Sequence, residues 1–249
     1  MTQAMPWKVA WITGASTGIG REMALQLAAR GVVVAASARS NDKLASLGPN
    51  IRSYPLDVTD RAAVLATIIS IERDLGPIDL AVFAAGTYTP VNVESLDPAI
   101  FETAMATNYL GVVNALAGLL PKMITRRGGH VAWIASVAGY VGLPKAAAYG
   151  PSKAALINLA ESLKLELDMR GVTLSIINPG FVETPLTAQN DFYMPFLMKA
   201  PEAAKLSIDG LARRRFEIAY PLRFVMIMKL ARLLPYALFF RMIQTMLNK

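Results

Sequence analysis

The first 180 residues alternate between short apolar runs rich in β-branched residues and longer segments with helical spacing. We expect strands at residues 9–12, 32–37, 52–56, 80–83, 131–135 and 174–177. Between them, segments such as 20–30 and 61–75 are expected to be helices. Strands that are apolar throughout are typical of a parallel sheet covered on both faces. The alternation therefore predicts a doubly wound α/β Rossmann fold.

The chain has no internal repeat and no recognisable linker, so residues 1–249 are expected to form one domain. After Asn178-Pro179-Gly180 the pattern changes, and residues 184–213 are expected to form a substrate lid that ends in a helix over 201–213. A short strand is expected at 216–219. Residues 221–249 form an apolar, basic tail, which Pro235 is expected to divide into two helices.

Composition narrows the chemistry. The chain has no cysteine, which excludes disulfides, thiolate catalysis and cysteine-bound zinc. Its single histidine, His130, cannot form a histidine metal cluster, and a structural role at a strand start is favoured over catalysis. We therefore predict no metal. Residues 1–8 lack the features of a secretory signal, so a cytoplasmic enzyme is expected.

Charge is unevenly distributed. Residues 199–249 contain 10 Lys and Arg but 3 Asp and Glu, which accounts for the whole formal charge of +7. Nucleic acid or anionic lipid could attract such a segment. Nucleic acid is not expected as a partner, because the motifs below predict a different function.

A glycine-rich turn follows the first predicted strand and opens the first predicted helix. Gly14 permits a tight turn, Gly18 lets the backbone approach a phosphate, and Gly20 allows close packing of helix on strand. Free N–H groups at the helix start would bind a pyrophosphate. The predicted contacts are Gly14, Ser16, Thr17, Gly18, Ile19 and Gly20. Alone, the G-x-x-x-G-x-G spacing is also consistent with a mere tight connection.

Arg39 lies at the end of the second predicted strand, where an NAD site usually has a carboxylate for the ribose 2′-hydroxyl. A guanidinium would instead bind a 2′-phosphate through charge-assisted hydrogen bonds, which favours NADP(H) over NAD(H). The alternative is a solvated surface arginine. Asp57 and Val58 are placed to reach the adenine, although Asp57 could be a simple turn residue.

Three residues form a candidate catalytic set. Ser136 ends the fifth predicted strand, and Tyr149 and Lys153 share one face of the next helix because they are four residues apart. A lysine ammonium would lower the pKa of the tyrosine, which could then exchange a proton with a carbonyl oxygen. Lys153 could also bind the nicotinamide ribose, and Ser136 could donate to the developing oxyanion. Taken singly, each residue has an ordinary structural explanation.

The combination resembles the short-chain dehydrogenase/reductase family. The matching motifs are T-G-x-x-x-G-x-G at 13–20, Asn108 within 107–111, Ser136, Y-x-x-x-K at 149–153 and N-P-G at 178–180, and the match covers about residues 8–184. The resemblance implies a seven-stranded, mostly parallel sheet in the order 3-2-1-4-5-6-7, with helices on both faces and a C-terminal helical extension. It also implies that Tyr149 is the proton donor or acceptor.

The resemblance assigns further residues. Asn108 would hold a water in a proton relay behind Lys153. Residues that would contact the nicotinamide end are Pro179, Gly180, Val182 and Thr184, and those passing near the adenosine ribose are Ala85 and Gly86. One position departs from the family pattern, because Ala84 replaces an amide that braces the central sheet. We expect a local effect on the rigidity of the cofactor site.

The substrate is less constrained. Bulky apolar residues after Ser136 and in the predicted lid suggest that the substrate is a lipophilic ketone, aldehyde or alcohol. The alternative is that many of them pack the lid itself. These residues are Tyr140, Val141, Leu143, Leu186, Phe192, Tyr193, Met194, Phe196, Leu197 and Met198. We predict an NADP(H)-dependent oxidoreductase that transfers a hydride between nicotinamide and such a substrate. The alternative is an NADP(H)-binding scaffold or redox sensor without turnover.

Apolar residues make up 54% of the chain, above the usual fraction of about 45–50%, and this surplus predicts further contacts of the protein surface. A homo-oligomer, dimer or tetramer, is expected. The tail is too often interrupted by charge to span a bilayer. It could pack on a second subunit or on the lid, which is the more common fate of an amphipathic helix. It could also make a peripheral contact with a membrane.

Overall fold

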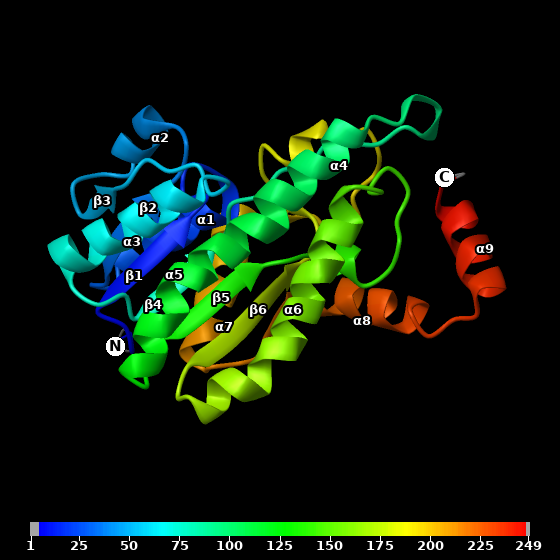
Figure 1. Cartoon of the computed structure of the whole chain (residues 1–249). Coiled ribbons are helices and arrows are strands. Elements are labelled where there is room, and N and C mark those ends of the chain that lie inside the picture. The colour runs from blue at the N-terminus through cyan, green and yellow to red at the C-terminus, as the bar shows by residue number, and fades with distance from the viewer. Residues whose placement is uncertain (1–4, 248–249) are drawn as a thin grey trace.

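The computed structural model describes residues 5–247 and contains a central parallel sheet of seven strands in the order β3-β2-β1-β4-β5-β6-β9 (Figure 1). The strands are β1 (Val9–Thr13), β2 (Val33–Ser37), β3 (Ile51–Ser53), β4 (Leu80–Phe83), β5 (His130–Ile134), β6 (Thr173–Pro179) and β9 (Glu217–Tyr220). Because β9 is the seventh strand of this sheet along the chain, the order is the one that the resemblance implied. The predicted fold class is confirmed.

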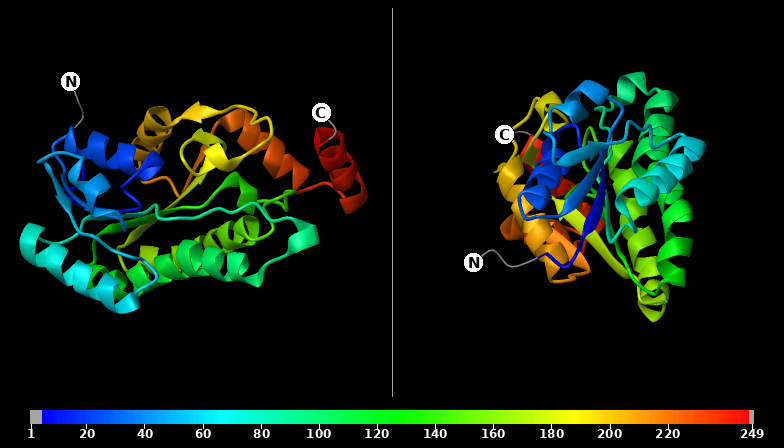
Figure 2. Two further views of the ribbon diagram at one scale, coloured as in Figure 1. Left: turned by 90° about the horizontal axis from the view of Figure 1, so that it is seen from above. Right: turned by 90° about the vertical axis from the view of Figure 1, so that its left-hand side faces the viewer.

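Helices cover both faces of the sheet (Figure 2). On one face lie α1 (Gly18–Ala28) and α7 (Ala200–Ala212), and on the other lie α3 (Arg61–Leu75), α5 (Gly111–Thr125) and α6 (Tyr149–Met169). The shorter helices α2 (Asn41–Ala45) and α4 (Pro98–Ala104) lie near the carboxyl ends of the strands (Figure 1). This edge of the sheet is where open α/β folds bind their ligands.

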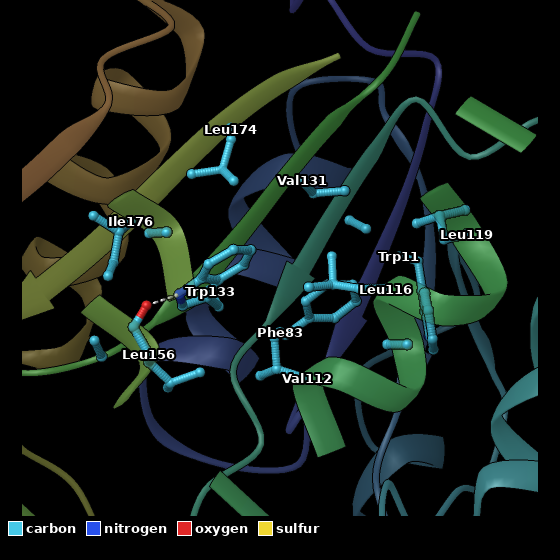
Figure 3. Close-up of a cluster of buried hydrophobic side chains, with 14 of the residues drawn as sticks. Trp11, Phe83, Val112, Leu116, Leu119, Val131, Trp133, Leu156, Leu174 and Ile176 are labelled. Carbon is cyan, nitrogen blue, oxygen red and sulfur yellow. Dashed lines mark hydrogen bonds between the residues drawn. The ribbon is translucent and has the colours of Figure 1, made fainter. Parts of the chain in front are cut away.

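Strand β1 illustrates how apolar residues fill both layers. Trp11 points into the cluster beneath α3 and α5, whereas its neighbours Ala10 and Ile12 point into the cluster beneath α1 and α7. Figure 3 shows Trp11 and Trp133 in the first cluster, where the Trp133 indole donates a hydrogen bond to the Leu156 carbonyl at 3.0 Å. The sheet is therefore buried on both sides, as its continuous apolar strands predict.

One continuous helical stretch among the described residues, Pro98–Thr125, is long and apolar enough to cross a membrane. It comprises α4, a π-helical turn η2 (Met105–Leu110) and α5. Its apolar side chains Val112, Leu116 and Leu119 are buried against the sheet. Packing of this buried face in the core accounts for part of the apolar character of the stretch.

The C-terminal third departs from the simple layers. Helix α7 is buried against α1, so the predicted lid over 184–213 includes a helix of the covering layer, and the excursion outside that layer is residues 184–199. That excursion follows β7 (Val182–Glu183) and ends with β8 (Met198–Lys199), and these two strands pair with each other. The tail forms α8 (Leu222–Ala231) and α9 (Tyr236–Leu247), and Pro235 lies between them.

Candidate active site

The turn between β1 and α1 has a backbone that only glycine fits well. Gly14 and Gly18 have φ angles of +66° and +58°, a region that other residues rarely adopt. A Cβ atom at Gly14 would lie 2.5 Å from the Ala85 nitrogen, and one at Gly20 would lie 2.5 Å from the Gly14 carbonyl oxygen. The turn is thus pressed against the end of β4, and the first N–H groups of α1 are left free for an anion.

This turn borders a cavity of about 500 Å³ at the carboxyl edge of the sheet. The cavity brings together all of the residues predicted to bind a cofactor, which come from five strand ends and from α1 and α6. They are Gly14, Ser16, Thr17, Gly18, Ile19, Gly20, Arg39, Asp57, Val58, Ala85, Gly86, Tyr149, Lys153, Pro179, Gly180, Val182 and Thr184. Their roles in binding remain predictions, but their positions define one elongated site.

Two cations line one end of the cavity. Arg39, after β2, is exposed there, and Lys43 in α2 lies at the same end. Lys43 was not predicted, although a second basic residue four positions after Arg39 was a usable signal. Asp57 has a local structural role, since its Oδ1 accepts hydrogen bonds from the Thr59 N–H (2.9 Å) and Oγ1 (2.8 Å). These bonds hold the pKa of Asp57 below its usual value.

The candidate catalytic residues meet at the other end of the cavity. Ser136 follows β5, and its Oγ accepts a hydrogen bond from the Ala138 N–H at 3.1 Å. Tyr149 begins α6, and Lys153 one turn later lies with its Nζ 5.4 Å from the Tyr149 ring centroid. Nζ also donates to the Ile134 carbonyl at 2.8 Å, which ties the lysine to the end of β5. The three side chains thus share the end of β5 and the start of α6.

Burial controls the protonation of this pair. It raises the pKa of Tyr149 to about 12, which outweighs the opposite effect of a hydrogen bond with Ser136. It lowers the pKa of Lys153 to about 7. The expected lowering of the tyrosine pKa by an adjacent ammonium is therefore not the dominant effect here. Burial therefore favours the protonated form of Tyr149 at neutral pH.

Asn108 is fully buried in the π-helical turn η2 and organises the loop after β4. Its Oδ1 accepts from the Thr87 N–H at 2.7 Å, and its Nδ2 donates to the Thr87 carbonyl at 3.0 Å and to Ser152 Oγ at 2.9 Å. Ser152 in turn donates to the Tyr149 carbonyl at 2.7 Å. These bonds connect the loop after β4 to the first turn of α6. The role of Asn108 in a water relay remains a prediction.

Two residues of this cluster were missed by the sequence reasoning. Ser152 lies inside the Y-x-x-x-K motif but has no distinguishing pattern, and it is fully buried. The ring of Tyr88 packs edge-on against Tyr149 with centroids 5.3 Å apart. Tyr88 follows Thr87, so the bonds from Asn108 to Thr87 also position this ring. Only the contact between distant segments identifies either residue.

Ala84 occupies the position where the family usually has an amide. It lines the cavity, and its Cβ would lie 3.2 Å from a Cβ built on Gly20. The small side chain therefore lies against the glycine-rich turn. The following Ala85 N–H points to Thr13 Oγ1 at 3.3 Å, which connects β4 to β1 at this level.

The apolar residues predicted to surround a substrate lie in different places. Leu186 lines the cavity, together with Pro185 and Thr187. Phe192 instead packs on the ring of Phe181, with centroids 5.9 Å apart, and Phe196 lies beside Phe224 of the tail at 6.1 Å. Phe181 and Phe224 stack on each other at 5.5 Å. The phenylalanines Phe192 and Phe196 therefore pack on neighbouring aromatic rings instead of lining the cavity.

Tyr140 and His130 also lie outside the main cavity. Tyr140 borders a second cavity of about 290 Å³, where its hydroxyl donates to Glu217 Oε1 at 2.5 Å. His130 is buried at the start of β5, bonded to Ser175 Oγ at 2.8 Å, and burial lowers its pKa to about 3. Its position at the opposite end of the strand from Ser136 agrees with a structural role.

The sequence of this chain is similar to those of known oxidoreductases. The family model "short chain dehydrogenase" matches residues 8–192. An uncharacterized oxidoreductase of Myxococcus xanthus is 38% identical over 242 residues, covering 94% of this chain and 96% of that protein. The 3-oxoacyl-(acyl-carrier-protein) reductase of Escherichia coli is 34% identical over 184 residues, covering 72% of this chain and 75% of the relative.

Solved structures share the fold. A short chain dehydrogenase/reductase from Burkholderia phymatum in complex with NAD has a TM-score of 0.84 at 23% identity, covering 92% of this chain and 94% of the other. An actinorhodin polyketide ketoreductase with NADPH has a TM-score of 0.78 at 25% identity, covering 88% and 97%. The architecture therefore recurs in proteins with either nicotinamide nucleotide.

Proposed function

This chain belongs to the short-chain dehydrogenase/reductase family of oxidoreductases, and we propose that it is an NADP(H)-dependent reductase of lipophilic carbonyl compounds. The observation that carries the proposal is the meeting of Ser136, Tyr149 and Lys153 at one end of a cavity whose other end is cationic. The reverse reaction, oxidation of the corresponding alcohol, would use the same groups.

The cavity fits a dinucleotide. The glycine turn leaves no room for a Cβ at Gly14 and directs the start of α1 at the site, which suits a pyrophosphate. Arg39 and Lys43 together suit a 2′-phosphate, and no carboxylate occupies the residue positions 38–40 at the end of β2. These features support NADP(H). Its 2′-phosphate needs cationic partners, whereas the 2′-hydroxyl of NAD(H) is usually bound by a carboxylate.

In the reaction, NADPH would supply the hydride and the protein would supply the proton and the orientation. Tyr149, with its pKa raised to about 12, would donate its phenolic proton to the carbonyl oxygen. The Ser136 hydroxyl would donate a hydrogen bond to the same oxygen as negative charge develops on it. Lys153, held by Ile134, would orient the ribose and return a proton to Tyr149.

A lipophilic substrate is favoured by the lid side of the cavity, where Val182, Pro185 and Leu186 present apolar surface. The name of the E. coli relative, a 3-oxoacyl reductase, adds a carbonyl on an acyl chain as a class to test first. A cytoplasmic location and a homo-oligomeric state are further parts of the proposal. The chemistry itself requires neither.

The test is turnover of NADPH with a series of ketones, aldehydes and 3-oxoacyl thioesters of increasing chain length. We expect kcat/KM to rise with chain length and NADPH to be preferred over NADH. Tight NADPH binding without oxidation across the series would contradict the proposal and favour a cofactor-binding scaffold. The Tyr149→Phe protein is the control, since it keeps the fold but lacks the proton.

A further inference from the structure

The C-terminal segment 221–247, together with the neighbouring excursion, presents an apolar surface that the described fold does not cover. Helix α8 buries Phe224, Val225 and Met228 against the body of the protein. Its outward face exposes Leu222, Met226 and Leu230, which follow one another at intervals of four residues. The helix is therefore apolar on both faces but buried on only one, and its outward apolar face is left exposed to solvent.

Helix α9 continues this surface beyond Pro235. It lies apart from the sheet and its covering helices at one end of the molecule (Figures 1 and 2). Tyr236 and Phe240 stack on one another at 5.9 Å and remain 79% and 61% exposed. In the connection between the helices, Leu233 is 79% exposed. Exposed aromatic and aliphatic residues in this number mark an interaction site.

The charges of the segment are of one sign. Residues 221–247 contain Arg223, Lys229, Arg232 and Arg241 and no Asp or Glu. Lys229 pairs with Glu217, whereas no carboxylate within the described part of the chain lies at ion-pair distance from the three arginines. All three arginines are exposed. An anionic surface would complement this segment both through its charges and through its apolar side chains.

We propose that α8 and α9 lie flat on an anionic lipid bilayer, with their exposed apolar side chains inserted among the acyl chains and their arginines at the headgroups. The helices have 10 and 12 residues, too short to span a bilayer, which needs about 20. Interfacial helices combine an apolar face with Lys and Arg, whose long side chains reach the headgroup level. The proposal therefore concerns a peripheral contact.

A second copy of the chain fits this surface less well. An isologous contact pairs the same patch of both subunits, so both halves of the interface would carry the same excess of positive charge. Because the segment contains no carboxylate, nothing within it would neutralise them. Lipid phosphates provide that neutralisation without a matching protein surface.

The surface adjoins the active-site excursion. Phe224 of α8 stacks on Phe181 at 5.5 Å and lies beside Phe196 at 6.1 Å, and Tyr193 of the same excursion is fully on the outside. Leu186 at the start of this excursion lines the cavity. If the proposed reductase function holds, the contact brings the excursion that borders the cavity close to the bilayer, from which a lipophilic carbonyl would enter.

The test is flotation of the full-length protein with vesicles, without cofactor or substrate, so that it does not depend on activity. Vesicles of equal phosphatidylglycerol and phosphatidylcholine are compared with phosphatidylcholine alone, at low and high salt. We expect flotation on the anionic vesicles, and about fivefold weaker binding for each arginine changed to Gln. High salt should weaken binding further.

A pair of double variants separates this surface from general surface hydrophobicity. Leu222→Glu/Phe240→Glu changes the proposed surface, whereas Leu165→Glu/Met169→Glu changes residues of α6 that are 74% and 72% exposed. We expect the first to lose flotation by at least tenfold and the second to keep it, with unchanged circular dichroism for both. No flotation of the unmodified protein, or equal loss in both variants, would overturn the proposal. So would a dimer in light scattering that only the first variant dissociates, because a second copy would then cover the surface.

Discussion

The glycine-rich turn region and the C-terminal segment use apolar residues in opposite ways. Around the turn, Trp11, Ile12 and Val82 are fully buried, and the backbone itself forms the binding surface. In residues 221–247 the outward apolar side chains are exposed and the charge is entirely positive. Burial thus determines the chemistry of the active site, whereas the exposed apolar side chains determine which surfaces the protein can contact.

The largest expected effect concerns the buried site. Replacing Tyr149 with Phe removes the proton donor but leaves the ring that packs on Tyr88. We expect kcat/KM for carbonyl reduction to fall by about 10²- to 10⁴-fold, the usual contribution of a general acid. NADPH binding, measured by fluorescence, should change little. An unchanged rate would remove Tyr149 from the mechanism.

The two faces of α8 give the next contrast. Phe224→Ala removes a buried ring that packs on Phe181 and touches the position of Gly180, and we expect a loss of about 3–4 kcal/mol in the free energy of unfolding. Leu222→Ala on the outward face should change it by less than about 0.5 kcal/mol. Urea denaturation measures both. Similar losses would show that the outward face is covered in solution.

Lys153 links stability to pH. Its pKa is about 7 in the folded protein and near 10.5 when unfolded, so the unfolded chain holds an extra proton between these values and stability rises with pH across that window. Below pH 7 the net cost of the buried charge, about 5 kcal/mol, is present in full.

The Lys153→Met protein removes this titrating charge. We expect it to be inactive yet more stable than the unmodified protein by up to about 5 kcal/mol at pH 6, with the gain disappearing toward pH 10.5. Thermal unfolding at several pH values checks this expectation. A gain that is independent of pH would mean that the lysine is not titrating in the folded state.

The smallest effect on the active site is expected at the cationic end of the cavity, where Arg39 and Lys43 are exposed. Arg39→Asp should weaken NADPH by about 10- to 100-fold and NADH far less, because it removes a charge-assisted hydrogen bond and adds repulsion of a 2′-phosphate. Isothermal titration with both nucleotides measures the change, and Lys43→Asp tests the second cation in the same way. Equal affinity of the unmodified protein for both nucleotides would contradict the role of Arg39.

Sequence alone determined those features that depend on residues close together in the chain. Alternating strands and helices, the glycine turn and the i, i+4 pair of Tyr149 and Lys153 are local patterns. The interruption of the tail by Pro235, which lies between α8 and α9, is local as well. The strand order and the role of Asn108 came from resemblance to a family, and the order is confirmed by the sheet.

Tertiary structure alone decided how distant segments meet. It placed Thr87, Asn108 and Ser152 in one hydrogen-bonded chain. It also turned Phe196 of the excursion toward Phe224 instead of the cavity. It also set the pKa of Tyr149 by burial, against the expected effect of Lys153. The physical reason is common to all of these: packing and desolvation depend on which surfaces meet in space, and no local pattern records that.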